Sequence, residues 1–213
     1  MGAMIFGCLL GLLISYWDVV ESNSDPRLNK TKIGESYSTA IEKASPAVVN
    51  IYSEQIFKNN KKSPPRLNSI FGSSDQIRTS LGSGVILSSD GYILTNQHVV
   101  GKQSIRVIAE LTDGRKFITR LVGIDEGTDL AVLKIDDPKA NFPSMELEDS
   151  DKVNVGDIVL AIGNPYGLGQ SVSMGIISAT GREFDNPYSN YLQTDASINL
   201  GNSGGALIDS NGR

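Results

Sequence analysis

After Pro46, short apolar runs recur along the chain between glycine and aspartate turns. Two Asp-Gly dipeptides, at residues 90–91 and 113–114, lie between apolar runs, which is a strong hairpin signal. The first dipeptide separates residues 85–87 from 92–94, and the second separates residues 105–111 from 116–122, so a hairpin is predicted at each. Further strands are predicted at residues 130–135, 157–162, 170–180, 190–194 and 205–209. Many short strands with regular turns indicate a β-sandwich or a β-barrel.

Three other segments differ from this β pattern. Residues 36–43 are predicted to form a short helix capped by Ser36, and Pro46 prevents the helix from continuing. Residues 54–80, which contain two adjacent prolines and many Asn, Lys and Ser residues, are predicted to be a loop. The acidic residues 136–151 are predicted to connect two β-domains.

The N-terminal end of the sequence is uncharged and strongly apolar over residues 3–17, and residues 18–35 have the polar composition of a linker. A helix over residues 3–17 spans roughly 22 Å, which is short of a hydrocarbon core of ~30 Å. A cleaved signal peptide is therefore an alternative to a membrane anchor. No Ala-x-Ala-like cleavage site follows, and Tyr16 and Trp17 suit a membrane interface, which favours the anchor. The absence of Lys or Arg before the segment departs from both patterns.

The composition bears on two questions, the kind of partner and the cellular compartment. The 213 residues carry a net charge of −5, and no basic stripe is present, so a nucleic-acid partner is not expected. The single cysteine, Cys8, excludes a disulfide within the chain, which is compatible with either the cytoplasm or the periplasm.

The chain's only histidine, His98, and the glycine-rich run GNSGG at residues 201–205 point to nucleophilic catalysis. A serine hydroxyl is a poor nucleophile until a base, usually histidine, takes its proton. Ser203 lies in the middle of the run, where glycines permit a tight turn with positive φ. Such a turn can aim the N–H groups of Gly201 and Ser203 at one point, which is what an oxyanion requires.

The third member of a catalytic triad is a carboxylate that orients the histidine, and three aspartates compete for this role: Asp113, Asp125 and Asp129. Asp129 is favoured because it opens the apolar run 130–133, where an unpaired buried carboxylate would be costly. The resulting order, histidine then aspartate then serine, is that of chymotrypsin-like enzymes. It differs from the order in α/β-hydrolases, which argues against an esterase or lipase.

Three segments resemble the catalytic blocks of the HtrA family of serine proteases: TNQHVV at 95–100, TDLAVLKI at 128–135 and the stretch 193–207 around Ser203. LGSGVI at 81–86 and AIGNPY at 161–166 are also similar to family segments. The resemblance covers about residues 36–213. Within the family it is strongest to the membrane-anchored type, because of the short loop between Tyr52 and Leu81, the run 164–170 and the single N-terminal apolar segment.

The resemblance implies an all-β fold, a chymotrypsin-like double β-barrel with a truncated second barrel, preceded by a short N-terminal apolar helix. The expected division is residues 1–17 as membrane anchor or signal segment, 18–35 as linker, 36–137 as the first barrel and 138–213 as the second barrel. His98 and Asp129 belong to the first barrel and Ser203 to the second, with the active site in the cleft between them. In the family, two further strands and a PDZ domain follow the position of Arg213, so an incomplete second barrel is expected.

The implied function is a serine endopeptidase of the bacterial envelope, which performs regulated cleavage of a membrane-protein substrate in an envelope stress response. His98 acts as base and then acid, Asp129 orients it, and the N–H groups of Gly201 and Ser203 hold the oxyanion. Arg182 and Tyr166 match positions near a regulatory switch.

The expected partners are a protein or peptide substrate, identical chains in a homotrimer, and the inner membrane, with the catalytic part in the periplasm. No metal, other cofactor or nucleic acid is expected. The alternative is a proteolytically inactive fragment, or a tethered binding or chaperone module with the same fold.

Overall fold

The computed structural model describes residues 36–57, 76–138, 141–183 and 190–213. The chain divides into two units, Met1–Ser36 and Tyr37–Arg213, and the fold below is that of the second unit. The apolar segment predicted at residues 3–17 and the linker predicted at residues 18–35 lie outside the described residues. The helices within the described residues are all too short or too polar to cross a membrane.

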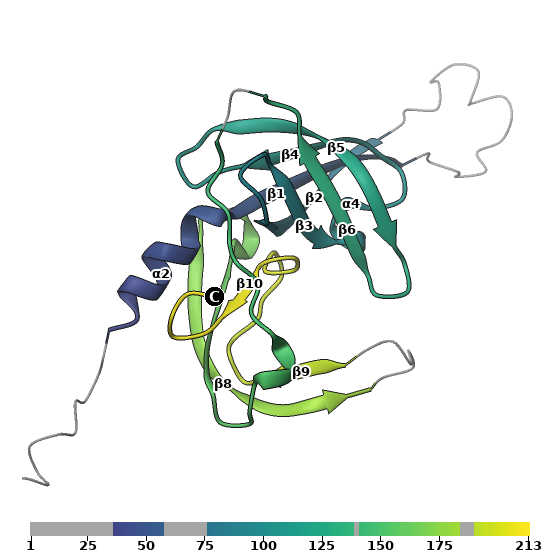
Figure 1. The fold of residues 1–213 in the computed structure, drawn as a ribbon. Coiled ribbons are helices and arrows are strands. Elements are labelled where there is room, and N and C mark those ends of the chain that lie inside the picture. Colours follow the sequence, from purple (N-terminus) through teal and green to yellow (C-terminus); the bar gives the residue numbers. More distant parts are fainter. Residues whose placement is uncertain (1–35, 58–75, 139–140, 184–189) are drawn as a thin grey trace, which may run out of the picture. The chain divides into compact units, whose positions relative to one another are not determined.

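A closed six-stranded barrel is formed by the first six strands (Figure 1). These strands are β1 (Val48–Phe57), β2 (Gln76–Ile86), β3 (Tyr92–Asn96), β4 (Ser104–Glu110), β5 (Lys116–Asp125) and β6 (Leu130–Ile135). They are hydrogen-bonded in the order β1-β2-β3-β6-β5-β4, and β4 pairs with β1 to close the barrel. The two predicted hairpins are confirmed, since Val85 pairs with Leu94 across one and Val107 with Thr119 across the other.

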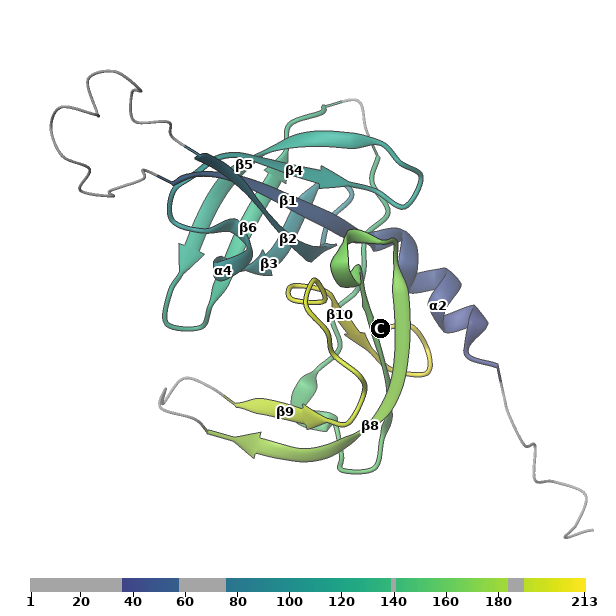
Figure 2. The same cartoon turned by 180° about the vertical axis from the view of Figure 1, so that it is seen from behind.

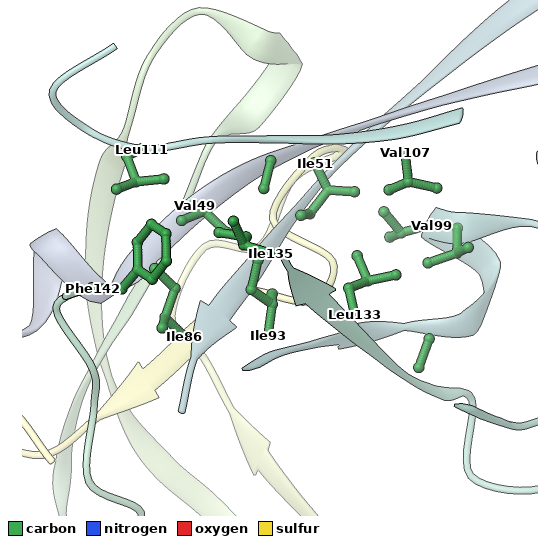
Figure 3. Close-up of a cluster of buried hydrophobic side chains, with 13 residues drawn as sticks. Val49, Ile51, Ile86, Ile93, Val99, Val107, Leu111, Leu133, Ile135 and Phe142 are labelled. Atoms are coloured by element: carbon green, nitrogen blue, oxygen red, sulfur yellow. The ribbon is translucent and has the colours of Figure 1, made fainter. Parts of the chain in front are cut away.

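The barrel interior is filled with aliphatic side chains (Figure 3). Burial alternates along β6, where Ala131, Leu133 and Ile135 point inward and their neighbours do not. Each fully buried side chain of the size of Leu133 contributes about 1.5–3 kcal/mol relative to exposure. Phe142, from the segment after β6, closes one end of this core and packs edge-on against Phe117, with ring centroids 5.3 Å apart.

The second part of the fold is an open four-stranded sheet with the order β10-β7-β8-β9. Its strands are β7 (Ile158–Gly163), β8 (Ser171–Arg182), β9 (Tyr191–Thr194) and β10 (Ala206–Ile208). Short 3-10 helices lie at Ser150–Lys152 (η2) and Pro165–Gly167 (η3). A closed barrel followed by an open sheet confirms the predicted double-barrel architecture with an incomplete second barrel.

The N-terminal helix of the described chain packs with the second sheet rather than inside the first barrel (Figures 1 and 2). Helix α2 (Ser38–Ala44) is followed by the 3-10 helix η1 (Ser45–Ala47), which contains Pro46. The N-cap is Tyr37, whose carbonyl accepts from the N–H of Ile41, so the cap lies one residue later than the predicted Ser36. The buried face of α2, Ala40 and Ala44, shares one apolar cluster with residues of β7 and β10: Leu160, Ile162, Ala206 and Ile208.

The loop predicted at residues 54–80 is shorter than expected, and this prediction was wrong at both ends. β1 continues to Phe57 and β2 begins at Gln76, so the two strands pair throughout, for example Gln55 with Arg78. The side chain of Glu54 accepts two hydrogen bonds from Arg106 on β4, at 3.0 and 2.8 Å. The residues at both ends of the predicted loop are therefore paired strand residues. Residues 58–75 lie outside the described residues.

Candidate active site

The imidazole of His98 is held by Asp129 through a two-point contact. His98 lies in the short helix α4 (Gln97–Val100), directly after β3, and Asp129 directly precedes β6. One carboxylate oxygen of Asp129, Oδ1, accepts from the main-chain N–H of His98 at 2.9 Å, and the other, Oδ2, lies 2.6 Å from Nδ1. With the proton on Nδ1, the other ring nitrogen, Nε2, is free to accept a proton.

The backbone of Asp129 supports the same arrangement. Its φ of 57° lies in the left-handed region, where aspartate is one of the few non-glycine residues that occur with any frequency. Its carbonyl accepts from the N–H of Gln97 and from the side-chain Nδ2 of Asn96, both at 2.9 Å. These bonds tie the start of β6 to the end of β3, and they fix the carboxylate beside α4.

Asp129 was favoured from the sequence because it was expected to be buried, and that premise was wrong. The side chains of His98 and Asp129 are 55% and 42% exposed. Water screens the charges of a pair this exposed. The two side chains are therefore placed by the geometry of their hydrogen bonds and not by burial away from water.

The two rival aspartates are engaged in their own turns. Asp125 accepts from the Thr128 hydroxyl and from the N–H of Gly127, both at 2.9 Å, and these bonds lower the pKa of Asp125. Asp113 accepts from the N–H and the Nε of Arg115 at 3.0 and 2.8 Å. The carboxylate that contacts the imidazole is that of Asp129.

Ser203 lies half-buried in a tight turn before β10. The N–H of Asn202 donates to the Asn199 carbonyl at 3.0 Å, and the N–H of Gly205 donates to the Asn202 carbonyl at 2.8 Å. Gly201 and Gly204 have φ values of 102° and 81°, which a residue with a Cβ adopts only with strain. Glycine is thus required at these two positions by the conformation of the backbone, as predicted.

The Ser203 turn is attached to the same edge of the first barrel that carries His98. The carbonyl of Ser203 accepts from the N–H of Ser83 on β2 at 2.8 Å. A Cβ on Gly204 would overlap the Ser83 carbonyl and the Thr95 hydroxyl, so the turn lies directly on the end of β3, where α4 begins. In Figures 1 and 2 the segment that leads into β10 lies beside β3 in both views.

The peptide groups on both sides of Gly201 are hydrogen-bonded through their carbonyls. The Leu200 carbonyl accepts from the N–H of Tyr166 at 3.0 Å, and the Gly201 carbonyl accepts from the Ser83 hydroxyl at 2.8 Å. Because C=O and N–H point in opposite directions across a trans peptide, the N–H of Gly201 points away from Tyr166. Two hydrogen bonds therefore determine where this candidate oxyanion donor is aimed.

The two residues predicted to belong to a regulatory switch lie on different segments. Tyr166, in η3, has a φ of 58° and contacts the Leu200-Gly201 peptide through its N–H. Arg182 ends β8, pairs with Tyr191 of β9 in the strand register, and donates from Nε to Gln193 Oε1 at 3.2 Å. The structure thus connects Tyr166 directly to the Ser203 turn, whereas Arg182 lies on the β8-β9 ribbon.

Sequence reasoning missed three residues that hold this site, namely Ser83, Thr95 and Asn164. All three are buried polar residues that contact the Ser203 turn or one another. The available signal was the position of Ser83 between two glycines in LGSGVI. Among the residues that the structure describes, no group of three or more His, Cys, Asp and Glu residues is placed to hold a metal ion.

A closed β-barrel, a second sheet and a histidine-aspartate pair beside a glycine-flanked serine are the marks of the trypsin-like class of peptidases. Residues 82–213 match the model of the trypsin-like peptidase domain, and the chain belongs to this family. Its relatives include HtrA-type proteases, which confirms the predicted resemblance.

Several curated serine proteases are similar to this chain. The serine endoproteases DegS of Salmonella typhimurium and of Escherichia coli K12 are each 44% identical over 212 residues, which cover 98% of this chain and 56% of the relative. The periplasmic serine endoprotease DegP of E. coli K12 is 49% identical over 144 residues, or 66% of this chain and 30% of DegP. The chain therefore spans about half the length, or less, of these relatives.

Solved structures agree with this assignment. The HtrA-type protease AlgW with a tripeptide is 48% identical, with a TM-score of 0.70 over 84% of this chain and 52% of that one. A serine endoprotease from Yersinia pestis is 46% identical, with a TM-score of 0.66 over 85% of this chain and 56% of that one.

Proposed function

We propose that the chain is the catalytic part of a serine endopeptidase of the bacterial envelope. The observation that carries the proposal is the two-point contact between Asp129 and His98, on the barrel edge to which the Ser203 turn is hydrogen-bonded. A histidine fixed in one tautomer beside a serine in a glycine-flanked turn is the arrangement that acyl transfer requires.

In the proposed mechanism, Nε2 of His98 takes the proton of the Ser203 hydroxyl as Oγ attacks the carbonyl carbon of the scissile peptide bond. The N–H groups of Gly201 and Ser203 stabilise the negative oxygen of the tetrahedral intermediate. His98 then gives its proton to the leaving amine, which leaves an acyl-enzyme that water hydrolyses by the same steps. Asp129 keeps the proton of the resting imidazole on Nδ1 and stabilises the imidazolium. One well-aimed oxyanion donor is worth about 10²–10³ in kcat.

The substrate proposed for this site is a protein or peptide. Support comes from the AlgW structures, which were solved with peptides, and from the endoprotease activity named for the DegS relatives. The finer proposal is regulated cleavage of a membrane-protein substrate in an envelope stress response by a homotrimer. It rests on likeness to the DegS relatives over 98% of the chain.

The proposed location is the inner membrane, with residues 3–17 as the anchor and the catalytic part in the periplasm. Two relatives, DegQ and DegP of E. coli K12, are named as periplasmic proteases, which supports the periplasmic side. The proposed division of the chain is the one expected from the sequence: residues 1–17, 18–35, 36–137 and 138–213.

A tethered binding or chaperone module is the second candidate. The observation in its favour is the set of exposed apolar side chains on and near the second sheet, among them Met174 at 62% and Leu200 at 77%. Exposed apolar surface of this kind is typical of binding sites.

Labelling with a fluorophosphonate, which reacts with activated serines, separates the two candidates. The full-length protein is expected to take up one label, and Ser203→Ala is expected to take up none while keeping its melting temperature. A protein that stays unlabelled, with no cleavage of a casein or peptide panel, favours the binding module. Labelling that persists in Ser203→Ala overturns the choice of nucleophile.

A further inference from the structure

Ser83 is a buried residue of the first barrel whose main-chain and side-chain polar groups all form hydrogen bonds. It lies on β2 and is 0% exposed. Its N–H donates to the carbonyl of Ser203 at 2.8 Å, and its own carbonyl accepts from the Thr95 hydroxyl at 2.6 Å. The main chain of Ser83 thus connects the candidate nucleophile to β3.

The Ser83 hydroxyl reaches two separate loops of the second half of the chain. It donates to the Gly201 carbonyl at 2.8 Å and accepts from the N–H of Asn164 at 3.0 Å. Gly201 and Asn164 are also in contact, since a Cβ on Gly201 would overlap the Asn164 carbonyl. A single hydroxyl therefore bridges the end of β7 and the start of the Ser203 turn.

The glycines on both sides of Ser83 explain how this contact is possible. Successive residues of a strand face opposite sides, so Gly82 and Gly84 share the face opposite Ser83. A Cβ on Gly82 would overlap the side chain of Val99 in α4, and one on Gly84 would overlap the side chain of Ile93 in the barrel core. The glycines allow α4 and the core to approach β2, while Ser83 faces the second sheet.

We propose that Ser83 is a positioning residue that sets the direction of the Gly201 N–H through its hydroxyl. This inference rests on the proposed function, since it concerns the oxyanion donor of that reaction. Gly201 has no side chain and a φ of 102°, so its neighbouring peptides are held by their hydrogen bonds. Ser83 holds the carbonyl on one side directly, and Tyr166 holds the carbonyl on the other.

The Ser83 hydroxyl also supports the hydrogen bond by which the Tyr166 N–H holds the Leu200 carbonyl. It fixes the N–H of Asn164, two residues before Tyr166, whose N–H holds the Leu200 carbonyl. Without the hydroxyl, both peptides beside Gly201 lose support, and the Gly201 N–H spends less time aimed at the developing oxyanion. Because this donor acts mainly on the transition state, the loss belongs in kcat and not in KM.

The test uses the full-length enzyme with Ser83→Ala, Ser83→Thr and a control, Thr119→Val. Thr119 also donates a hydroxyl hydrogen bond to a main-chain carbonyl, that of Val107 at 3.1 Å, but on β5 and β4 of the first barrel. Ser83→Ala is expected to lower kcat roughly 10–100-fold with KM within about threefold, which is part of the 10²–10³ loss of a whole donor. Ser83→Thr, which keeps the hydroxyl, restores most of kcat, and Thr119→Val has no such effect.

A peptide boronic acid supplies the readout that a merely structural role would not affect. Its boron accepts the Ser203 oxygen, His98 takes the displaced proton, and the tetrahedral adduct places an oxygen where the oxyanion forms. Ser83→Ala is expected to weaken boronate binding by the same factor as kcat. Binding of an uncleaved substrate peptide, measured with Ser203→Ala as background, stays unchanged.

Several outcomes overturn the proposal. These are an unchanged kcat in folded Ser83→Ala, a loss in kcat without a loss in boronate affinity, or an equal loss in Thr119→Val. If Ser83→Ala does not fold, Ser83→Cys is measured in its place, because the cysteine thiol is only a weak hydrogen-bond donor. Its kcat is compared with that of Ser83→Thr. Equal kcat values for these two variants overturn the proposal. If the wild type shows no turnover, or if Ser203→Ala keeps it, the proposed function fails instead, so the two failures are distinguishable.

Discussion

Asp129 contacts His98 at both the main chain and the ring, with one carboxylate oxygen for each. The main-chain bond places the carboxylate relative to α4, and the ring bond then orients the imidazole. Such a contact keeps its geometry even though both side chains are substantially exposed. The orientation of the base therefore depends on local geometry at the junction of β3, α4 and β6.

Replacing Asp129 by asparagine tests this relationship. The asparagine side chain still accepts from the main-chain N–H, but its amide group donates to the ring and stabilises the wrong tautomer. We expect Asp129→Asn to lower kcat by about 10⁴, by analogy with the same substitution in chymotrypsin-like enzymes. Asp125→Asn is the control, since Asp125 caps its own turn, and its kcat is expected to stay within about threefold. The reverse pattern would identify Asp125 as the orienting carboxylate.

Alanine substitutions at Gly204 and Gly114 distinguish the cost of backbone strain from the cost of steric overlap. Both have positive φ, 81° and 85°, but a Cβ on Gly114 meets nothing within 4 Å, whereas one on Gly204 overlaps the Ser83 carbonyl. Gly114→Ala is expected to lower the free energy of unfolding by about 1–2 kcal/mol, the cost of the left-handed conformation. Gly204→Ala is expected to lose about 1–3 kcal/mol more because of the overlap. Urea unfolding of both variants measures the difference, and equal losses would contradict the packing described for the Ser203 turn.

Glu110 gives the protein a defined pH dependence of stability. The hydroxyl of Tyr52 donates to Glu110 at 2.6 Å and, with weaker contributions from Asn50 and Lys116, lowers the pKa of Glu110 below its ordinary value of 4.5. A lowered pKa in the folded state stabilises the fold above the unfolded pKa, and this contribution is lost as pH falls through the folded value. We expect Glu110→Gln to flatten the fall in unfolding free energy between about pH 5 and pH 3.

Tyr52, the hydrogen-bond partner of Glu110, makes stability depend on pH in the alkaline range. Burial, together with the bond to Glu110, raises the pKa of Tyr52 from 10.0 to about 12. A raised pKa stabilises the fold below the unfolded pKa, so this contribution is lost as pH rises from about 10 to about 12. Tyr52→Phe removes this loss and part of the acid dependence. If Tyr52→Phe and Glu110→Gln both keep the wild-type dependence of unfolding free energy on pH, the hydrogen bond between Tyr52 and Glu110 does not contribute to stability.

The Leu200-Gly201 peptide is predicted to change direction between resting and active enzyme. In the structure its carbonyl accepts from the N–H of Tyr166, which aims the Gly201 N–H away from that residue. We expect the bond to be absent in a ligand-free, full-length enzyme and to form on binding of a peptide boronic acid. Amide hydrogen exchange of the segment around Tyr166 should then slow on inhibition. A ligand-free crystal structure with the Gly201 N–H already aimed at the oxyanion site would contradict the prediction.

Membrane topology follows from the interpretation of residues 3–17. If they form an anchor, protease treatment of spheroplasts digests the catalytic part, and a carbonate wash leaves the protein in the membrane pellet. A helix of this length requires local thinning of the bilayer or additional apolar residues. Release of a soluble form shorter by about 17 residues would show a cleaved signal peptide instead.

The strands were predictable because the alternation that defines them is local, and β6 occupies the predicted residues, Leu130–Ile135. β1 and most of β2 were not among the predicted strands, and Gln55 and Arg78 pair within a segment that was predicted to be a loop. Ser203 and His98 were apparent from residue type and spacing. The importance of Ser83 was not, because its partners, Asn164 and Gly201, lie 81 and 118 residues away along the chain.

The packing of α2 has a consequence for biosynthesis. Ala40 and Ala44 are buried against residues of β7 and β10, the latter ending at Ile208. At about 5–20 residues per second, the ribosome needs roughly 10–30 s to make the chain between Ala40 and Ile208. A helix of 7 residues is not stable alone, so α2 stays unstructured during that time, while the strands of the first barrel can already close. Helix α2 is thus made before the strands it packs against and can fold only after they have been made.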